Sequence, residues 1–347
     1  MNKENNFNLL RLLAAIQVMF FHTIEHFNIK LNYLKYFSSY SGVIIFFTIS
    51  GYLIYLSLER NKNNIKQYII NRLVRIYPAL WLSTIISCLL LVFSGYLKVK
   101  EIFNLKMLMY WFGQLTMFQF WTPNILRNYG VGTPNGSLWT ITVELQFYFA
   151  LLLVLTFIRK QKIINLLFIV SIFLNMLIYK NFGKDSVAAK LFFVTVIPYF
   201  YNFMIGVYFA KYRDYLMKFI ENKVIYWFII YNLYVYGLKI YPTYYPNIFS
   251  LISNILLGIL VLSFAFSFKK VSNFLIKDMD ISYGIYLYHM LFLNFTMFKY
   301  NGGGETLDNK KILFYIVTTI LTAVFSYKFM EKPALNYFKN KRGKNDE

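Results

Sequence analysis

The sequence carries little charge for its length, and acidic residues are especially scarce. Only 15% of the 347 residues are Asp, Glu, Lys or Arg, and 15 acidic side chains stand against 36 basic ones. A soluble domain carries roughly a quarter charged residues. Hydrophobic residues make up 58% of the chain and aromatic residues 21%. Too little polar surface remains to cover a water-soluble globule, so we expect lipid to solvate the chain.

The sequence also lacks the residues and motifs of several common types of site. A single cysteine, Cys88, excludes an intrachain disulfide, and no Cys/His pattern has the spacing of a zinc site, so we expect no metal. No P-loop and no dinucleotide-binding glycine pattern occurs. The first apolar run ends in His and Glu without a small-residue cleavage site, which indicates a retained span.

Apolar segments long enough to cross a membrane recur along the chain. About 20 residues at ~1.5 Å rise cross a ~30 Å hydrocarbon layer. We predict an all-α polytopic membrane protein with about ten transmembrane helices. A short re-entrant or interfacial segment, Met107–Trp121, is expected between helices three and four. The predicted spans are Asn8–Phe27, Tyr40–Leu58, Tyr77–Tyr96, Leu138–Ile158, Ile163–Tyr179, Ala189–Ala210, Lys223–Leu238, Ile248–Phe268, Ile281–Phe298 and Ile312–Met330.

The distribution of basic residues predicts the orientation of these spans. With both termini in the cytoplasm, most of the 36 Lys and Arg residues fall in cytoplasmic segments, as the positive-inside rule requires. The formal charge of +21 is therefore a topology signal, and we expect no nucleic-acid partner. We divide the chain into a membrane domain, residues 1–333, and a basic cytoplasmic tail, residues 334–347.

Ionisable residues inside a span are expensive, so each is a candidate functional residue. Arg11 and His22 lie eleven residues apart in the first span. In a helix this spacing is about 20° past three full turns, with roughly 16 Å between the two along the axis. Both side chains therefore share one face, with Arg11 near the cytoplasmic edge and His22 in the outer half.

Six ordered motifs resemble the acyltransferase-3 family of integral-membrane O-acyltransferases, over essentially the whole chain. The first is Arg-x10-His in the first span. The next four resemble G-V-x-x-F-F-x-x-S-G-x-L-I, R-x-x-R-I-x-P-x-x-W, S-L-W-S-x-x-x-E-x-Q-F-Y and S-Y-x-x-Y-L-x-H, and the last is E-K-P. They stand at Arg11–His22, Gly42–Ile54, Arg72–Trp81, Ser137–Tyr148, Ser282–His289 and Glu331–Pro333.

This resemblance implies an O-acyltransferase of the cytoplasmic (inner) membrane. Its donor would be a cytoplasmic acyl-CoA, usually acetyl-CoA, and its acceptor a hydroxyl of a surface polysaccharide or lipid-linked glycan on the outer side. Larger relatives carry a C-terminal SGNH esterase-like domain, which we do not find here. Acceptor handling is then expected in the membrane domain or in a partner protein.

The candidate site residues fit this chemistry by type and by depth. Arg72 and Arg75 share a helix face and, with Arg11, would bind the phosphates of coenzyme A through their guanidinium groups. His22 and Glu144 lie about 8 Å and 9 Å from the outer ends of their predicted spans. At matched depth, an imidazole can take the proton of the acceptor hydroxyl while a carboxylate orients it. A covalent acyl-enzyme stays open as an alternative.

Five further residues are candidates for lining the site. Glu25 and His26 share the face of His22, and His289 lies near mid-membrane in a later span. Trp139 and Tyr148 flank Glu144. Each of the five also has a structural interpretation, such as a solvated side chain, a hydrogen-bonding core histidine or an aromatic belt residue.

Two other functions compete with acyl transfer. A polytopic glycosyltransferase commonly places a catalytic carboxylate in the first outer loop, but residues 28–39 contain no Asp or Glu. A transporter or flippase of a glycan or small molecule predicts related halves, and the chain has no recognisable internal repeat. Transport also gives no reason for the Arg-x10-His spacing.

Overall fold

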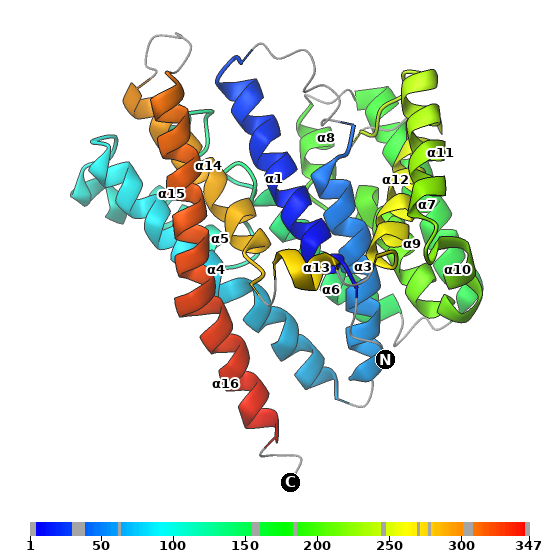
Figure 1. Cartoon of the computed structure of the whole chain (residues 1–347). Helices are drawn as coiled ribbons and strands as arrows, with labels where there is room; N and C mark the ends of the chain where they lie inside the picture. Colours follow the sequence, from blue (N-terminus) through cyan, green and yellow to red (C-terminus); the bar gives the residue numbers. More distant parts are fainter. Residues whose placement is uncertain are drawn as a thin grey trace. The chain divides into compact units, whose positions relative to one another are not determined.

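The described part of the protein is mainly helical (Figure 1). The structure, a computed structural model, describes residues 5–29, 39–61, 64–154, 160–182, 186–243, 248–268, 271–276, 279–300 and 308–343, and these contain no strand. Within them, five helical segments are long and apolar enough to cross a membrane: Phe7–His26, Gly42–Arg60, Ile65–Phe93, Ile248–Ala265 and Asn309–Lys341. The all-α class and the membrane helices are confirmed, and the count of ten stays a prediction.

The chain divides into two compact units. The first comprises Met1–Gln17, Tyr33–Ile65 and Val143–Asp278, and the second comprises Val18–Asn32, Lys66–Thr142 and Met279–Glu347. The first unit holds α3 (Gly42–Arg60), α7 (Gln161–Phe182), α8 (Val187–Phe192), η5 (Ile197–Tyr199), α9 (Phe200–Lys211), α10 (Arg213–Ile220), α11 (Val224–Gly237), α12 (Ile248–Ala265) and α13 (Val271–Leu275). The second unit holds η2 (Val99–Phe103), α5 (Leu105–Leu115), η3 (Asn124–Leu126), α14 (Ser282–Tyr300), α15 (Asn309–Ser326), η6 (Tyr327–Glu331) and α16 (Lys332–Gly343).

Three helices contribute to both units. Helix α1 (Phe7–His26) divides near its middle, α4 (Ile65–Phe93) belongs to the second unit except for its first residue, and α6 (Trp139–Leu153) belongs mainly to the first. No glycine or proline interrupts α1, which favours the helix throughout. It ends at His26, and Asn28 just beyond has a φ of 51°, a left-handed conformation that asparagine tolerates after a helix end.

In the first unit, α3 and α9 approach each other through two glycines. A Cβ added at Gly51 would lie 1.9 Å from the carbonyl oxygen of Phe203, and one added at Gly206 would lie 2.1 Å from that of Thr48. Small residues allow such backbone contact between membrane helices, where van der Waals packing replaces the hydrophobic effect. The glycine in the second motif therefore serves close helix packing.

The span predicted over Ala189–Ala210 is wrong as one continuous helix. The chain forms α8, an irregular stretch, η5 and then α9. Pro198 supplies no backbone N–H, which interrupts the helix. Neighbouring side chains bind the backbone groups that the break leaves without helical partners. Gln146 donates to Val194 O at 2.9 Å and accepts from Val196 N at 3.0 Å, and Asn175 donates to Pro198 O at 2.9 Å. Irregular backbone in a membrane protein requires such partners.

Helix α4 begins twelve residues before the predicted span at Tyr77 and passes through Pro78. Its 29 residues measure about 44 Å, which exceeds a ~30 Å hydrocarbon layer. The first turns carry polar side chains, including Lys66, Arg72 and Arg75. A hydropathy pattern cannot detect this part of the helix because its residues are suited to the membrane surface.

The segment predicted as Met107–Trp121 contains the short helix α5 followed by an irregular stretch up to α6. On α5, Met107, Tyr110 and Gln114 are buried, while Met109 and Phe112 are exposed. Asn294 of α14 holds the stretch that follows: its Oδ1 accepts from Val131 N at 2.8 Å, and its Nδ2 lies 3.0 Å from the carbonyl oxygens of Thr133 and Pro134. The predicted short segment is thus part of a longer region anchored on α14.

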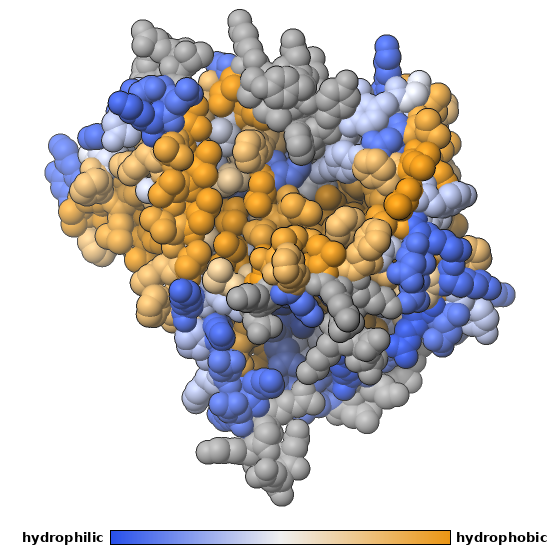
Figure 2. All heavy atoms as spheres, in the orientation of Figure 1, coloured by the Kyte–Doolittle hydropathy of each residue, from blue (hydrophilic) through white to orange (hydrophobic). Residues whose placement is uncertain are grey.

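Helix α15 continues through the π-helical turn η6 into α16. Leu313 and Leu321 of α15 are more than half exposed, and Figure 2 shows apolar side chains over this helix and polar ones over α16. The basic tail predicted for residues 334–347 is therefore helical up to Gly343, and its last four residues lie outside the described part.

We expect Gly51→Val to destabilise the protein by about 1–3 kcal/mol, the usual range for overpacking. The added side chain would meet the backbone of Phe203, which cannot rotate away. Thermal unfolding of the detergent-solubilised protein, followed by size-exclusion chromatography, measures the change. Gly237→Ala is the matched control because a Cβ there meets nothing within 4 Å. Equal melting temperatures for wild type and Gly51→Val would contradict the close packing.

Candidate active site

Two of the three histidines meet in the second unit. His22 comes from the second half of α1 and His289 from the middle of α14. Their side chains are joined at 3.0 Å between His22 Nδ1 and His289 Nε2, and the rings are nearly parallel, with centroids 5.2 Å apart. The sequence placed both residues in the membrane but did not predict that they touch.

The other ring nitrogen of His289 faces backbone oxygen. Nδ1 lies 2.7 Å from the carbonyl oxygen of Tyr286 and 3.2 Å from that of Ile285, one turn earlier in α14. His289 is fully buried, with 0% of its surface exposed. The structure therefore confines this histidine between its own helix and His22.

The second half of α1 is held on α15, and this fixes the direction of His22. Thr23 donates to Met19 O at 2.6 Å, and its hydroxyl oxygen lies 3.3 Å from that of Tyr315. The next buried position on this face, Phe27, packs edge-on against the Tyr315 ring at 5.7 Å. Thr23 thus anchors the helix beside the histidine.

The two other candidates on this part of α1 differ in their surroundings. The His26 ring lies 5.7 Å from the His22 ring, one turn further along the helix. Glu25 is exposed. His26 is thus brought to the histidine pair, and Glu25 is placed at the surface.

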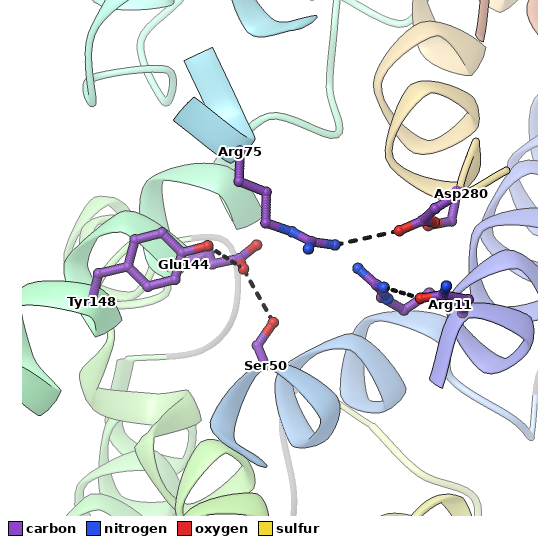
Figure 3. A network of polar contacts seen from close by, with 8 residues as sticks. Arg11, Ser50, Arg75, Glu144, Tyr148 and Asp280 are labelled. Carbon is purple, nitrogen blue, oxygen red and sulfur yellow. Dashed lines mark hydrogen bonds and ion pairs between the residues drawn. The ribbon is translucent and has the colours of Figure 1, made fainter. Parts of the chain in front are cut away.

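Glu144 belongs to the first unit, where α6 and α3 surround its carboxylate (Figure 3). Its Oε1 accepts from the Tyr148 hydroxyl at 2.7 Å and from Ser50 Oγ at 3.1 Å. Hydroxyl donors stabilise the ionised form of a carboxylate. Tyr148 was predicted to line the site, whereas Ser50 was not among the predicted site residues.

Two of the predicted arginines, Arg75 and Arg11, contact polar side chains within their own units. In the second unit, Arg75 pairs with Asp280 at 3.5 Å, and Asp280 also accepts from Ser282 Oγ at 2.5 Å at the start of α14 (Figure 3). In the first unit, Arg11 donates to Asn8 Oδ1. Arg72 is partly buried on α4, one turn before Arg75. Sequence reasoning missed Asp280, although it stands two residues before the S-Y-x-x-Y-L-x-H motif.

The predicted site residues are divided between the units. The second unit contains His22, Glu25, His26, Arg72, Arg75, Trp139 and His289, and the first contains Arg11, Glu144 and Tyr148. Trp139 is partly buried at the start of α6. The pairing of His22 with Glu144 stays a prediction. Among the described residues, no group of three or more His, Cys, Asp or Glu side chains could hold a metal ion.

The start of α6 and the irregular stretch before it are hydrogen-bonded to the turn of α14 that carries His289. The Tyr286 hydroxyl and Thr140 Oγ1 lie 2.7 Å apart, and Asn135 donates to Leu287 O at 2.9 Å. Ser137 Oγ donates to Tyr286 O at 3.3 Å. The residues of the fourth and fifth motifs thus contact each other within this unit.

Known proteins resemble this chain over most of its length. It is 32% identical over 353 residues to Nodulation protein 10 of Rhizobium leguminosarum bv. viciae, covering 96% of this chain and 93% of that protein. It is 26% identical to an O-acetyl transferase of Shigella phage Sf6, covering 83% of this chain and 84% of the relative.

A longer relative is Peptidoglycan O-acetyltransferase OatA of Listeria monocytogenes. It is 24% identical over 375 residues, which cover 97% of this chain and 57% of OatA. No solved structure matches the chain.

The family comparison agrees with the motifs and with the helical fold. The acyltransferase-3 model, described as an acyltransferase domain, matches residues 4–331. That range includes all ten candidate site residues and ends just before α16. This multi-pass membrane protein therefore belongs to the acyltransferase-3 family.

Proposed function

We propose that the protein is an O-acetyltransferase that moves an acetyl group from cytoplasmic acetyl-CoA to a hydroxyl of a surface polysaccharide or lipid-linked glycan. The observation that carries this proposal is the His22–His289 contact inside a helical membrane domain of an acyltransferase family. Two relatives bear O-acetyltransferase names, and one of them is named for peptidoglycan. A glycan acceptor for this chain is inferred from that name.

In this proposal the protein crosses the cytoplasmic membrane with ten helices and has both termini in the cytoplasm. The site extends from the cytoplasmic side of the membrane toward its outer side. Arg11, Arg72 and Arg75 bind the phosphates of acyl-CoA from the cytoplasmic side. The pantetheine arm brings the thioester to His22, and the acceptor approaches from the outer side. No metal takes part in this scheme, and acceptor delivery by a partner protein is compatible with it.

The proposed reaction is a direct acyl transfer. The acceptor oxygen attacks the thioester carbonyl carbon while its proton passes to His22, which acts as general base. The C–S bond then breaks, and the coenzyme A thiolate takes that proton from the imidazolium. The products are the O-acyl ester and free coenzyme A. Glu144, held by Ser50 and Tyr148, provides a negative charge that stabilises the positive charge on the imidazolium.

The experiment that tests the proposed function is mass spectrometry of surface glycans. We expect the mass of one acetyl group per modified residue in cells that carry the gene, and its loss when the gene is deleted. Restoring the gene restores the acetyl group. Glycan export that depends on the gene, with unchanged acetyl content, would instead favour a transporter.

His22→Ala should lower acyl transfer by at least about 10²-fold, since a positioned general base contributes roughly 10²–10⁴-fold. The rate of acetyl transfer from labelled acetyl-CoA in purified membranes measures this loss. Phe20→Ala is the matched control because Phe20 lies on the same helix and is 44% exposed. Equal amounts of both variants in the membrane fraction show that insertion is intact. Full activity of His22→Ala would remove it from the mechanism.

Arg72→Ala and Arg75→Ala should each raise the apparent KM for acyl-CoA by about tenfold or more. A hydrogen bond to a charged group contributes roughly 1.5–3 kcal/mol, and each variant removes a guanidinium from the donor site. Initial rates over a range of acyl-CoA concentrations measure the change. Lys66→Ala on the exposed start of α4 controls for the loss of one positive charge. An unchanged KM in both arginine variants would place the donor elsewhere.

A further inference from the structure

The two ring nitrogens of His289 have different hydrogen-bond partners. Nδ1 faces the carbonyl oxygens of Tyr286 and Ile285, and Nε2 faces Nδ1 of His22 at 3.0 Å. The side chain is 0% exposed.

The backbone contacts determine which nitrogen of His289 carries the proton. A carbonyl oxygen can only accept a hydrogen bond, so Nδ1 has to donate and is protonated. A neutral imidazole carries one N–H, and an uncompensated charge is costly in a fully buried position. His289 is therefore neutral, and its Nε2 offers only a lone pair.

The tautomer of His22 follows from that of His289. Because Nε2 of His289 can only accept, Nδ1 of His22 has to donate, and it carries the proton. The lone pair of His22 then lies on Nε2, on the far side of its ring from His289. A histidine without this partner would exchange between its two tautomers, and only one of them has its lone pair on Nε2.

We propose that His289 is a positioning residue that holds His22 as the Nδ1–H tautomer, with Nε2 as the basic nitrogen. This rests on the proposed function in that His22 is taken as the general base. The O–H bond of the acceptor breaks and an N–H bond forms at Nε2, while Nδ1 keeps its proton. The positive charge that results is shared through the Nδ1–H bond to His289.

This arrangement assigns to a neutral histidine the orienting role that a carboxylate has in the Ser-His-Asp triad. Nδ1 of His22 is already engaged by His289, so Glu144 does not orient the ring through that nitrogen. The anchor for His289 is the backbone of its own helix, and Thr140 fixes the neighbouring Tyr286 through a side-chain hydrogen bond. The orientation is thus determined within the second unit.

The tautomer can be observed directly because the full chain has only three histidines. We would record nitrogen NMR spectra of the full-length protein in lipid nanodiscs, with 15N-labelled histidine. Loss of signals in His22→Asn assigns the His22 resonances. We expect a protonated Nδ1 and an unprotonated Nε2 for His22. An unprotonated Nδ1 in the wild-type protein would overturn the proposal.

Two variants of His289 separate positioning from a merely structural role. His289→Gln places an amide oxygen near the former Nε2, which can still accept from His22, whereas His289→Leu removes the acceptor. We expect His289→Leu to lower kcat by about 10²-fold or more without changing the KM for acyl-CoA, and to give mixed His22 tautomers. His289→Gln should recover most of the kcat and the single tautomer.

The control for structural damage is Tyr288→Phe. Tyr288 is equally buried on α14, and its hydroxyl donates to Ser326 Oγ at 2.8 Å. This variant should keep both the tautomer and kcat. A His289→Leu protein that retains the wild-type tautomer would overturn the proposal. Full activity of His22→Ala, with the tautomer confirmed by NMR, would instead contradict the proposed function alone.

Discussion

Polar groups within the apolar helices of this protein have to find their partners in the protein itself, because hydrocarbon offers none. The break between α8 and α9 shows how this works. Gln146 satisfies the backbone at Val194 and Val196, and Asn175 binds the carbonyl of Pro198. Asn294 has the same task for the stretch that follows α5. Both irregular segments depend on amide side chains from neighbouring helices.

The same requirement limits the chemistry of the ionisable residues. Two hydroxyl donors bind Oε1 of Glu144, so this carboxylate acts as an acceptor. Backbone carbonyls face Nδ1 of His289, and they leave its other nitrogen to His22. The reactive atom at such a site is the nitrogen or oxygen that the structural hydrogen bonds leave available. The hydrogen-bond network of the site therefore identifies that atom.

Much of the fold could be predicted because hydropathy and length report directly on burial in lipid. The continuous apolar runs that became α1, α3, α12 and α14 were located to within a few residues. The failures have physical causes. The amphipathic start of α4 resembles a loop in a hydropathy pattern. Pro198 interrupts a helix here, although membrane helices often tolerate proline. The break is possible because Gln146 and Asn175 bind the backbone groups that it frees, and these contacts cannot be deduced from the sequence.

The sequence by itself determined the helical membrane fold, the family and the residue types available for acyl transfer, since these follow from composition and from ordered motifs. The tertiary structure decided which of those residues meet. His22 and His289 lie 267 positions apart, and Arg75 and Asp280 lie 205 apart. Contacts over such separations depend on how helices pack against each other, because side-chain spacing along one helix reports only on its own faces.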